Sequence, residues 1–103
     1  MSSLHFEWDE AKNLANQRKH GVSFEVAAQV FRDPLQVAVQ DRFEGGETRW
    51  QTFGLVGGVL ILLVAHTVRA EEDADGATIE VIRIISARRA DRTERRRYEE
   101  QNG

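Results

Sequence analysis

Hydrophobic and polar residues follow one another along this chain in patterns that predict a short strand, two helices, several longer strands and a final helix. Residues 4–8 alternate between apolar and polar side chains and indicate a short edge strand. Asp9 follows as the cap of a helix that extends to about His20, and Gly21 is placed to stop it. One face of this helix is expected to carry Ala11, Leu14, Ala15 and Arg18.

A second helix is predicted after Ser23, whose hydroxyl group can cap its first turn. Apolar residues then recur three and four positions apart, which is the spacing of one buried helix face. The residues of this face are Phe24, Ala27, Ala28 and Phe31. Asp33 and Pro34 end the pattern, so the helix is expected to stop there.

The rest of the chain reads mainly as strands separated by glycine-rich or acidic connections. The predicted strands cover residues 35–41, 48–56, 59–69 and 79–89. A loop at residues 43–47 and an acidic connection at residues 70–78 separate them. The predicted fold is therefore α+β in a single domain over residues 1–103. It has two N-terminal helices packed on a mostly antiparallel four-stranded sheet, followed by a C-terminal helix.

The pair Gly57-Gly58 predicts a two-residue hairpin, because both positions tolerate positive φ angles. Such a turn pairs Val56 with Val59, and counting back along both strands places Arg49 opposite His66 on one sheet face. A neighbouring guanidinium group would lower the pKa of His66 and leave a neutral imidazole that accepts a proton. The alternative is a core histidine at the end of an apolar strand, with its hydrogen bonds satisfied.

Positive charge is concentrated near the end of the chain, where a strand is followed by a helix. Between Arg83 and Arg97 there are seven arginines and only two acidic residues, Asp91 and Glu94. These two acids are three positions apart, which is the spacing of a capping box at the start of a helix. The junction of strand and helix therefore places arginines where a phosphate group could be held from two elements. A solvated charged surface is the alternative for the arginines of the helix.

Composition narrows the possible classes of function. The chain has 103 residues, no cysteine and a net charge of −3, so a disulfide framework is excluded and a general polyanion binder is disfavoured. Nearly all of its cations are arginines, which suit bidentate phosphate contacts. The longest apolar run, residues 59–65, is too short to span a bilayer, and no signal peptide is visible. We expect a cytoplasmic protein that uses no metal and no cofactor.

Five segments of the sequence resemble the BrnT family of type II toxins. They read FEWDEAKN from Phe6, RKHGVSFEVAAQVFRDP from Arg18, ETRW from Glu47, HTVR from His66 and IRIISARRADRTERRRYEE from Ile82. They stand in the family's order. The resemblance implies a RelE-like ribonuclease that cleaves RNA and arrests growth. It also implies a BrnA-type antitoxin with a ribbon-helix-helix domain. This antitoxin neutralises the toxin in a heterotetramer that contains two copies of each chain. Only the antitoxin would contact operator DNA.

Cleavage of RNA without a metal requires a base for the 2′-hydroxyl group, cations for the phosphorane and an acid for the leaving 5′-oxygen. We expect proton transfer by His66 or Tyr98, the latter because RelE-type relatives rely on a late tyrosine. Arg49 and Arg83 are expected to stabilise the phosphate. The residues expected to position the RNA strand are Lys19, His20, Arg69, Arg88 and Arg89. Trp50 would stack a base or, alternatively, belong to the core.

Two other classes of function stay open on the residues alone. A non-catalytic RNA-binding module would carry the same basic tail and would cut nothing. A structural partner protein would use the tail to bind an acidic or helical ligand and would show no affinity for RNA. The arginines by themselves do not separate these alternatives, so the family resemblance carries most of the weight for an enzyme.

Overall fold

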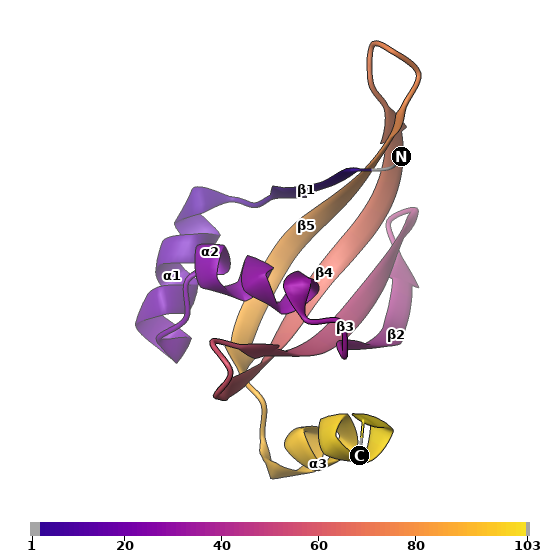
Figure 1. Ribbon diagram of the computed structural model, residues 1–103. Helices are drawn as coiled ribbons and strands as arrows, with labels where there is room; N and C mark the ends of the chain where they lie inside the picture. Colours follow the sequence, from indigo (N-terminus) through magenta and orange to yellow (C-terminus); the bar gives the residue numbers. More distant parts are fainter. Residues whose placement is uncertain (1–2, 103) are drawn as a thin grey trace.

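A five-stranded sheet with helices on both of its faces forms the frame of the protein in the computed structural model, which describes residues 3–102 (Figure 1). The strands are β1 (Ser3–Glu7), β2 (Val37–Glu44), β3 (Glu47–Val56), β4 (Leu60–Glu72) and β5 (Thr78–Arg89). Their order in the sheet is β1-β5-β4-β3-β2, with β1 parallel to β5 and every other pair antiparallel. The α+β class is confirmed. The predicted count of four strands is wrong, because β1 joins the sheet as a fifth strand.

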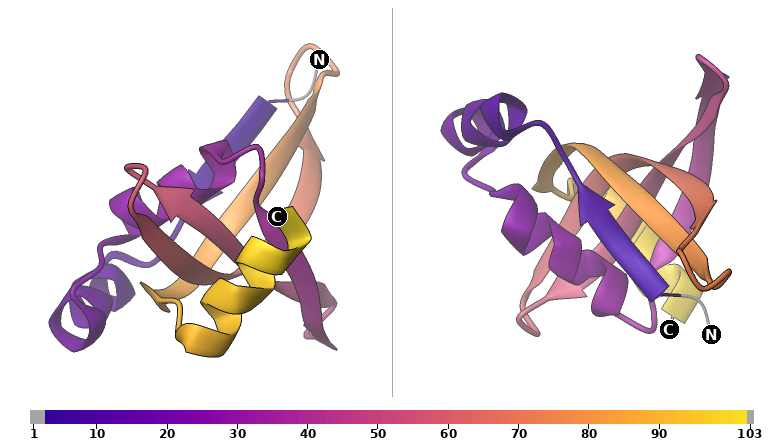
Figure 2. Two further views of the ribbon diagram at one scale, coloured as in Figure 1. Left: turned by 60° about the horizontal axis from the view of Figure 1, so that its bottom comes forward. Right: turned by 90° about the horizontal axis from the view of Figure 1, so that it is seen from above.

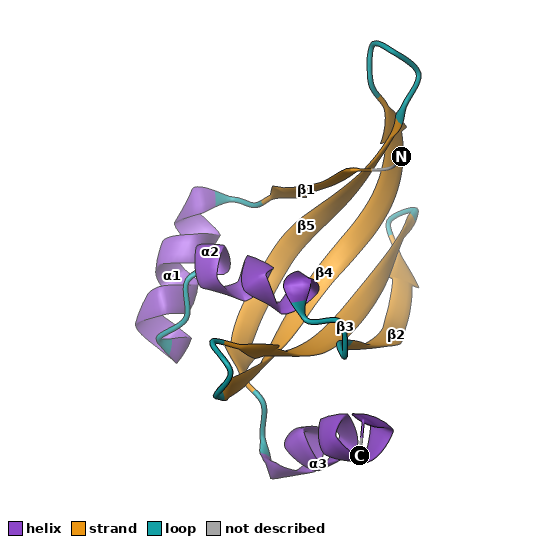
Figure 3. Cartoon of the chain, viewed as in Figure 1, coloured by secondary structure: helices purple, strands orange, loops and turns teal. Residues whose placement is uncertain are grey.

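Three helical segments cover one face of the sheet, and the last helix packs on the other (Figures 1 and 2). They are α1 (Glu10–His20), α2 (Phe24–Ala27) and the 3₁₀ helix η1 (Ala28–Arg32), followed at the end of the chain by α3 (Arg92–Asn102). Figure 3 shows these helical segments in one colour against the strands of the sheet, and α2 has only four residues. The predicted second helix is therefore a single α-helical turn that continues as η1. Within residues 3–102, each helix is too short or too polar to cross a lipid bilayer.

Helix α1 begins and ends as predicted, and the residues that it buries are polar. Asp9 accepts a hydrogen bond from the backbone of Lys12, and Gly21 adopts a left-handed conformation with a φ angle of 71°. The buried residues are Asn13 and Asn16, whereas Leu14 is 48% exposed. The face that α1 buries against the sheet is therefore polar.

The side-chain amide of Asn16 joins α1 to the sheet through hydrogen bonds with the backbone of β5. Its side chain donates to the carbonyl group of Ala87 at 2.8 Å and accepts from the N–H group of the same residue at 3.2 Å. Strand β1 pairs with β5 only as far as Arg83, so Ala87 lies beyond the last strand partner on that edge. Buried backbone groups need hydrogen-bond partners, and Asn16 supplies them where β1 has ended.

The turn between β3 and β4 contains one more residue than predicted. Gly57 and Gly58 have φ angles of 63° and 73°, but Val59 also belongs to the turn and Val56 pairs with Leu60. Arg49 therefore lies opposite Thr67, and Trp50 lies opposite His66. The predicted pairing of Arg49 with His66 is wrong, because a shift of one residue moves a side chain to the other sheet face.

Two further loops are shorter than the sequence suggested, because the strands beside them are longer. Strand β2 continues to Glu44 and β3 begins at Glu47, which leaves only Gly45 and Gly46 in a tight turn. Strands β4 and β5 extend as a long hairpin whose turn lies between Glu72 and Thr78. This hairpin projects beyond the rest of the sheet (Figure 1).

Each face of the sheet has its own apolar core. Buried side chains on the face beneath α1, α2 and η1 include Leu62, Val64, Ile82 and Ile84. On the opposite face, Phe53 and Leu63 pack against Tyr98 of α3. The capping box that begins α3 is confirmed, since Asp91 and Glu94 exchange two hydrogen bonds between side chain and backbone, each of 2.8 Å.

Candidate active site

A row of polar residues crosses four strands of the sheet in register. Arg49 of β3 pairs with Thr67 of β4, Thr67 pairs with Arg83 of β5, and Arg83 pairs with Glu7 of β1. Residues paired across strands share one face, and this is the face on which α3 packs, since Leu63 and Thr67 are four positions apart on β4. The row lies farther along the strands than α3, toward the long hairpin. Four side chains from distant parts of the sequence are thus brought side by side.

Glu7 is held between two arginines at one end of this row. Its two carboxylate oxygens accept hydrogen bonds from Arg83, at 2.8 Å, and from Arg69. Arg69 also donates to Glu71 at 2.8 Å. The hydrogen bond from Arg69 lowers the pKa of Glu7 most; burial opposes this, and Arg83 lowers it further. The carboxylate is therefore ionised at neutral pH.

The cluster of Glu7, Arg69 and Arg83 is open to solvent. Between 33% and 40% of each of these side chains is exposed. Ion pairs with this exposure contribute little to stability, about 1 kcal/mol or less. A phosphate group of a ligand can thus reach both guanidinium groups without opening the core. Among residues 3–102, no three His, Asp or Glu side chains come together in a way that could hold a metal ion.

Thr67, in the middle of the row, has an unused hydroxyl group. Its Oγ1 atom is buried and finds no hydrogen-bond partner within the described residues. Its cross-strand neighbours are Arg49 on one side and Arg83 on the other. Among residues 3–102, the one charged partner of Arg49 is Glu44, in a long ion pair of 3.8 Å. Adjacent strands are about 4.8 Å apart, so both arginines can reach a ligand placed over Thr67.

His66 lies on the opposite face of the sheet from this row. It is 3% exposed, its Nε2 atom is 2.7 Å from the hydroxyl group of Thr52, and its ring packs edge-on against Phe31. Burial lowers the pKa of His66 to about 4. The predicted direction of this shift is confirmed, but its cause is loss of water around the ring rather than a charged neighbour. His66 has the surroundings of a core histidine.

Trp50 lies beside His66, because the two residues are cross-strand partners. It lines a cavity on the face of the sheet that bears α1, α2 and η1. It therefore does not face the row that contains Arg49, although the two residues are adjacent in sequence.

Tyr98 fastens α3 to the sheet. It is 7% exposed, and its hydroxyl group donates to Asp33 at 2.5 Å. Burial and this hydrogen bond raise the pKa of Tyr98 to about 12. The same carboxylate oxygen of Asp33 accepts from the backbone N–H group of Leu55 at 2.8 Å. These contacts join three segments of the chain and leave the tyrosine hydroxyl group engaged.

Arg88 also makes contacts that position α3. It forms two hydrogen bonds with Glu94, at 2.7 Å and 2.9 Å, and Glu94 completes the capping box with Asp91. The hydrogen bonds from Glu94 raise the pKa of Arg88. This arginine is thus occupied where the chain passes from β5 to α3.

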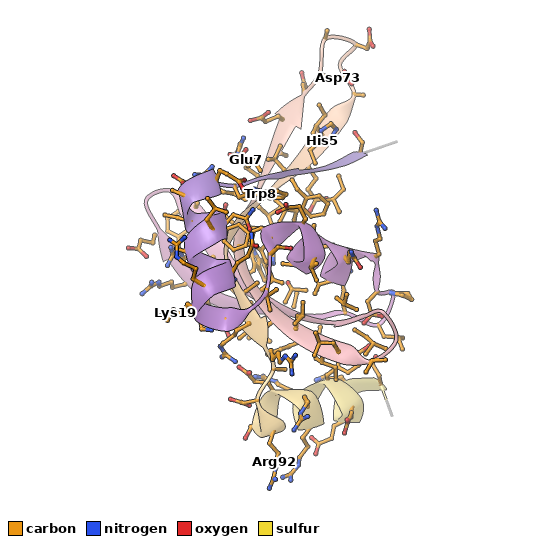
Figure 4. The ribbon with its side chains drawn as sticks, turned by 90° about the vertical axis from the view of Figure 1, so that its left-hand side faces the viewer. His5, Glu7, Trp8, Lys19, Asp73 and Arg92 are labelled. Atoms are coloured by element: carbon orange, nitrogen blue, oxygen red, sulfur yellow. The ribbon has the colours of Figure 1, made fainter. Side chains whose placement is uncertain are left out.

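Lys19, His20 and Arg89 lie at another end of the molecule. Figure 4 shows Glu7 beside the beginning of α1 and Lys19 at the far end of this helix. His20 is the last residue of α1. Arg89 ends β5 and lines a hollow with Gln17 and Gly21 at the C-terminal end of α1. The structure does not bring these three residues to the row.

Glu7 and Thr67 are the two polar residues of the row that sequence reasoning missed. The alternation over residues 4–8 was a usable signal for Glu7, since it places Phe6 and Glu7 on opposite faces of a strand. Its partners could not be read from it, because they depend on the parallel pairing of β1 with β5. Thr67 gives no sequence signal of its own.

Comparison with known proteins shows the family of this chain. Residues 8–94 match the model of a family described as the ribonuclease toxin, BrnT, of type II toxin-antitoxin systems. The chain is also similar in fold to the crystal structure of the Brucella abortus ribonuclease toxin, BrnT, at 22% sequence identity and a TM-score of 0.53. The aligned region covers 89% of this chain and 99% of that chain. No curated protein matches the sequence. The family model spans most of the chain, which therefore belongs to the BrnT family of ribonuclease toxins of type II toxin-antitoxin systems.

Proposed function

We propose that this ribonuclease cuts RNA at the row formed by Arg49, Thr67, Arg83 and Glu7, together with Arg69. The observation that carries the proposal is the carboxylate of Glu7 held between two partly exposed guanidinium groups. A fixed carboxylate beside fixed cations supplies the two functions that RNA cleavage needs most, which are proton removal and stabilisation of the phosphorane. No other group of residues singled out above combines them.

In the proposed reaction, the 2′-hydroxyl group of the RNA attacks the adjacent phosphorus atom. Glu7 accepts the proton of this hydroxyl group as the new bond between O2′ and phosphorus forms. Arg83 and Arg49 stabilise the phosphorane, and Arg69 keeps Glu7 ionised and oriented. The bond between phosphorus and O5′ then breaks, and O5′ takes a proton from solvent. The products are a 2′,3′-cyclic phosphate and a 5′-hydroxyl end, and the step needs no metal.

This proposal retains Arg49, Arg69 and Arg83 from the sequence analysis and assigns proton transfer to Glu7 instead of His66 or Tyr98. His66 lies on the other face of the sheet and is almost fully buried, and Tyr98 is engaged with Asp33.

The remaining predicted RNA-binding residues take other places in the proposal. Lys19, His20 and Arg89 bind RNA that extends past the cleavage site, whereas Arg88 has a structural role with Glu94. Trp50 belongs to the opposite face and is not assigned to RNA.

A type II toxin has a protein antitoxin, and its family description gives RNA as the substrate class. We further propose a BrnA-type antitoxin with a ribbon-helix-helix domain, two copies of each chain in the complex, and contact with operator DNA through the antitoxin alone. A kinship with RelE-type ribonucleases and a cytoplasmic site of action belong to the same proposal. The sequence motifs that resemble the BrnT family support these points.

The proposal is tested with purified protein and a short single-stranded RNA whose ends are labelled. The wild type is expected to release products that end in a 2′,3′-cyclic phosphate. Arg83→Ala is expected to cut about 100- to 1,000-fold more slowly, the range for loss of one group that stabilises a transition-state charge. Arg96→Ala, which removes an exposed arginine from α3, is the matched control and should cut at the wild-type rate.

Growth of a bacterium that expresses each variant gives an independent readout. The proposed site is supported if expression of the wild type or of Arg96→Ala arrests growth and expression of Arg83→Ala does not. Full activity of Arg83→Ala in both assays would remove the row from the site. Tight binding of RNA without any cleavage by the wild type would instead favour a non-catalytic RNA-binding module.

A further inference from the structure

An apolar cavity on the face of the sheet opposite the row has no role in the proposed reaction. Its volume is about 350 Å³, and its lining includes Leu4, Phe31, Trp50, Val68 and Ile82. These residues come from η1 and from four of the five strands, and β2 adds Ala38. The cavity therefore extends across all five strands of the sheet, beside the end of η1.

Exposed apolar side chains continue this surface on both sides of the cavity. Leu4, which lines it on β1, is 43% exposed. Phe43 of β2 is 69% exposed, and it pairs with Thr48, which is two positions from Trp50 and so on the same face. A cavity flanked by an exposed leucine and an exposed phenylalanine is the kind of apolar patch that marks a protein interaction site.

The side of this surface toward the long hairpin is acidic. Glu80 is the charged residue among those that line the cavity. The hairpin adds Glu72 at the end of β4 and Asp73 and Asp75 in the turn, and Figure 4 shows Asp73 at the projecting end of the molecule. An acidic rim repels the phosphates of RNA and attracts a partner that carries lysine or arginine. The surface thus fits a cationic protein segment better than the nucleic-acid substrate.

We infer that this surface binds a segment of the antitoxin, in which an apolar side chain enters the cavity and flanking lysines or arginines face Glu80 and the hairpin. The occupant follows from the type II toxin family, which requires a protein antitoxin, and from the acidic rim. The inference rests on the family assignment and not on the chemistry of the row.

The position of β1 links this surface to the proposed cleavage site. Leu4 lines the cavity, and Glu7 of the same edge strand lies on the other face with Arg69 and Arg83. Strand β1 is an edge strand of the sheet. A partner bound at the cavity on one face can therefore extend around β1 to the row on the other face. Binding at this surface therefore places the antitoxin where it can block the site.

Titration calorimetry with the purified antitoxin of this toxin tests the inference. Leu4→Glu and Phe43→Glu are each expected to weaken binding at least about 10-fold, as loss of an interface hot spot does. Val59→Glu is the matched control, because Val59 is 87% exposed in the β3–β4 turn, away from the cavity. Its affinity should stay within about twofold of the wild type. Glu80→Lys is expected to weaken binding most at low salt, since it reverses the charge of the rim.

RNA cleavage by each free variant separates this inference from the proposed active site. Variants that cut RNA like the wild type but lose the antitoxin support the inference. Wild-type affinity in Leu4→Glu and Phe43→Glu would overturn it. If Arg83→Ala alone loses affinity for the antitoxin, the antitoxin binds at the row and the inference is also overturned. If the two glutamate variants instead convert a dimer of the free toxin into a monomer in sedimentation, a second copy is the occupant and the inference is overturned. Failure of the wild type to cut RNA would count against the active site alone.

Discussion

Glu7 and Arg83 are 76 residues apart in sequence, yet their Oε2 and Nη1 atoms lie 2.8 Å apart on neighbouring parallel strands. Both side chains are partly exposed, so the ion pair contributes little to the stability of the fold. Parallel pairing of the first strand with the last one instead places a carboxylate beside the guanidinium groups of Arg69 and Arg83. The relationship therefore points to function, and variants of these residues can be interpreted without concern for unfolding.

Glu7→Gln keeps the shape of the side chain and removes its charge and its ability to accept a proton. We expect RNA cleavage to fall by about 100- to 10,000-fold, the range for loss of a general base. The melting temperature should change little, because the ion pairs that are lost are partly exposed and contribute little to stability. Glu99→Gln on α3 is the control for loss of one exposed negative charge. Cleavage by Glu7→Gln at the wild-type rate would exclude Glu7 as the base.

Thr67→Val tests whether the unpaired hydroxyl group in the row serves the substrate. The folded protein loses no hydrogen bond, so its free energy of unfolding should stay the same or rise. Cleavage should stay near the wild-type rate, because the hydroxyl group is buried and does not reach the RNA. The matched variant is Thr52→Val, which removes the hydrogen bond to His66. It should lose about 1–2 kcal/mol of stability and also keep its activity.

Tyr98→Phe tests the structural role of the tyrosine in α3. The change removes its hydrogen bond to Asp33, a buried contact with a charged acceptor. We expect the free energy of unfolding in urea to fall by about 1–3 kcal/mol, with RNA cleavage by the folded protein unchanged. Loss of cleavage without loss of stability would return Tyr98 to the catalytic role that the sequence analysis gave it.

His66 should make the stability of the protein depend on pH. Its folded-state pKa of about 4 is below the ordinary value of 6.5, so between these values the unfolded chain binds the proton more readily. Stability must therefore fall as the pH is lowered from 6.5 to 4, by about 3 kcal/mol from this residue. Urea unfolding at several pH values should show a smaller loss in His66→Gln. Equal losses in the two proteins would mean that the imidazole is not desolvated in the fold.

Gly54→Ala should destabilise the packing of η1 on β3. A Cβ atom at this position would lie 2.6 Å from the Cγ1 atom of Val30 and 2.8 Å from its carbonyl oxygen. The second contact is with backbone, so the helix itself must move. We expect a loss of about 1–3 kcal/mol in thermal or urea unfolding. Gly46→Ala, in the open β2–β3 turn, makes no such contact and gives the cost of the positive φ angle alone.

Local patterns in the sequence predicted most of the elements. Asp9, Ser23 and Asp91 cap helices as expected, and Gly21 ends α1, because a cap depends only on residues within about one turn. The glycine pairs also lie in turns. The family was evident as well, since its motifs run along most of the chain.

Contacts between distant segments had to come from the tertiary structure. One additional turn residue, Val59, shifted the register and separated Arg49 from His66, because side chains alternate between sheet faces with a period of two. The buried face of α1 could not be predicted, since Asn16 is buried by backbone groups of β5 that are 71 residues away. The sequence by itself determined the helices, the turns, the arginine-rich tail and the family. Only the tertiary structure decided which arginines meet a carboxylate, because β1 pairs with β5, the last strand in the sequence.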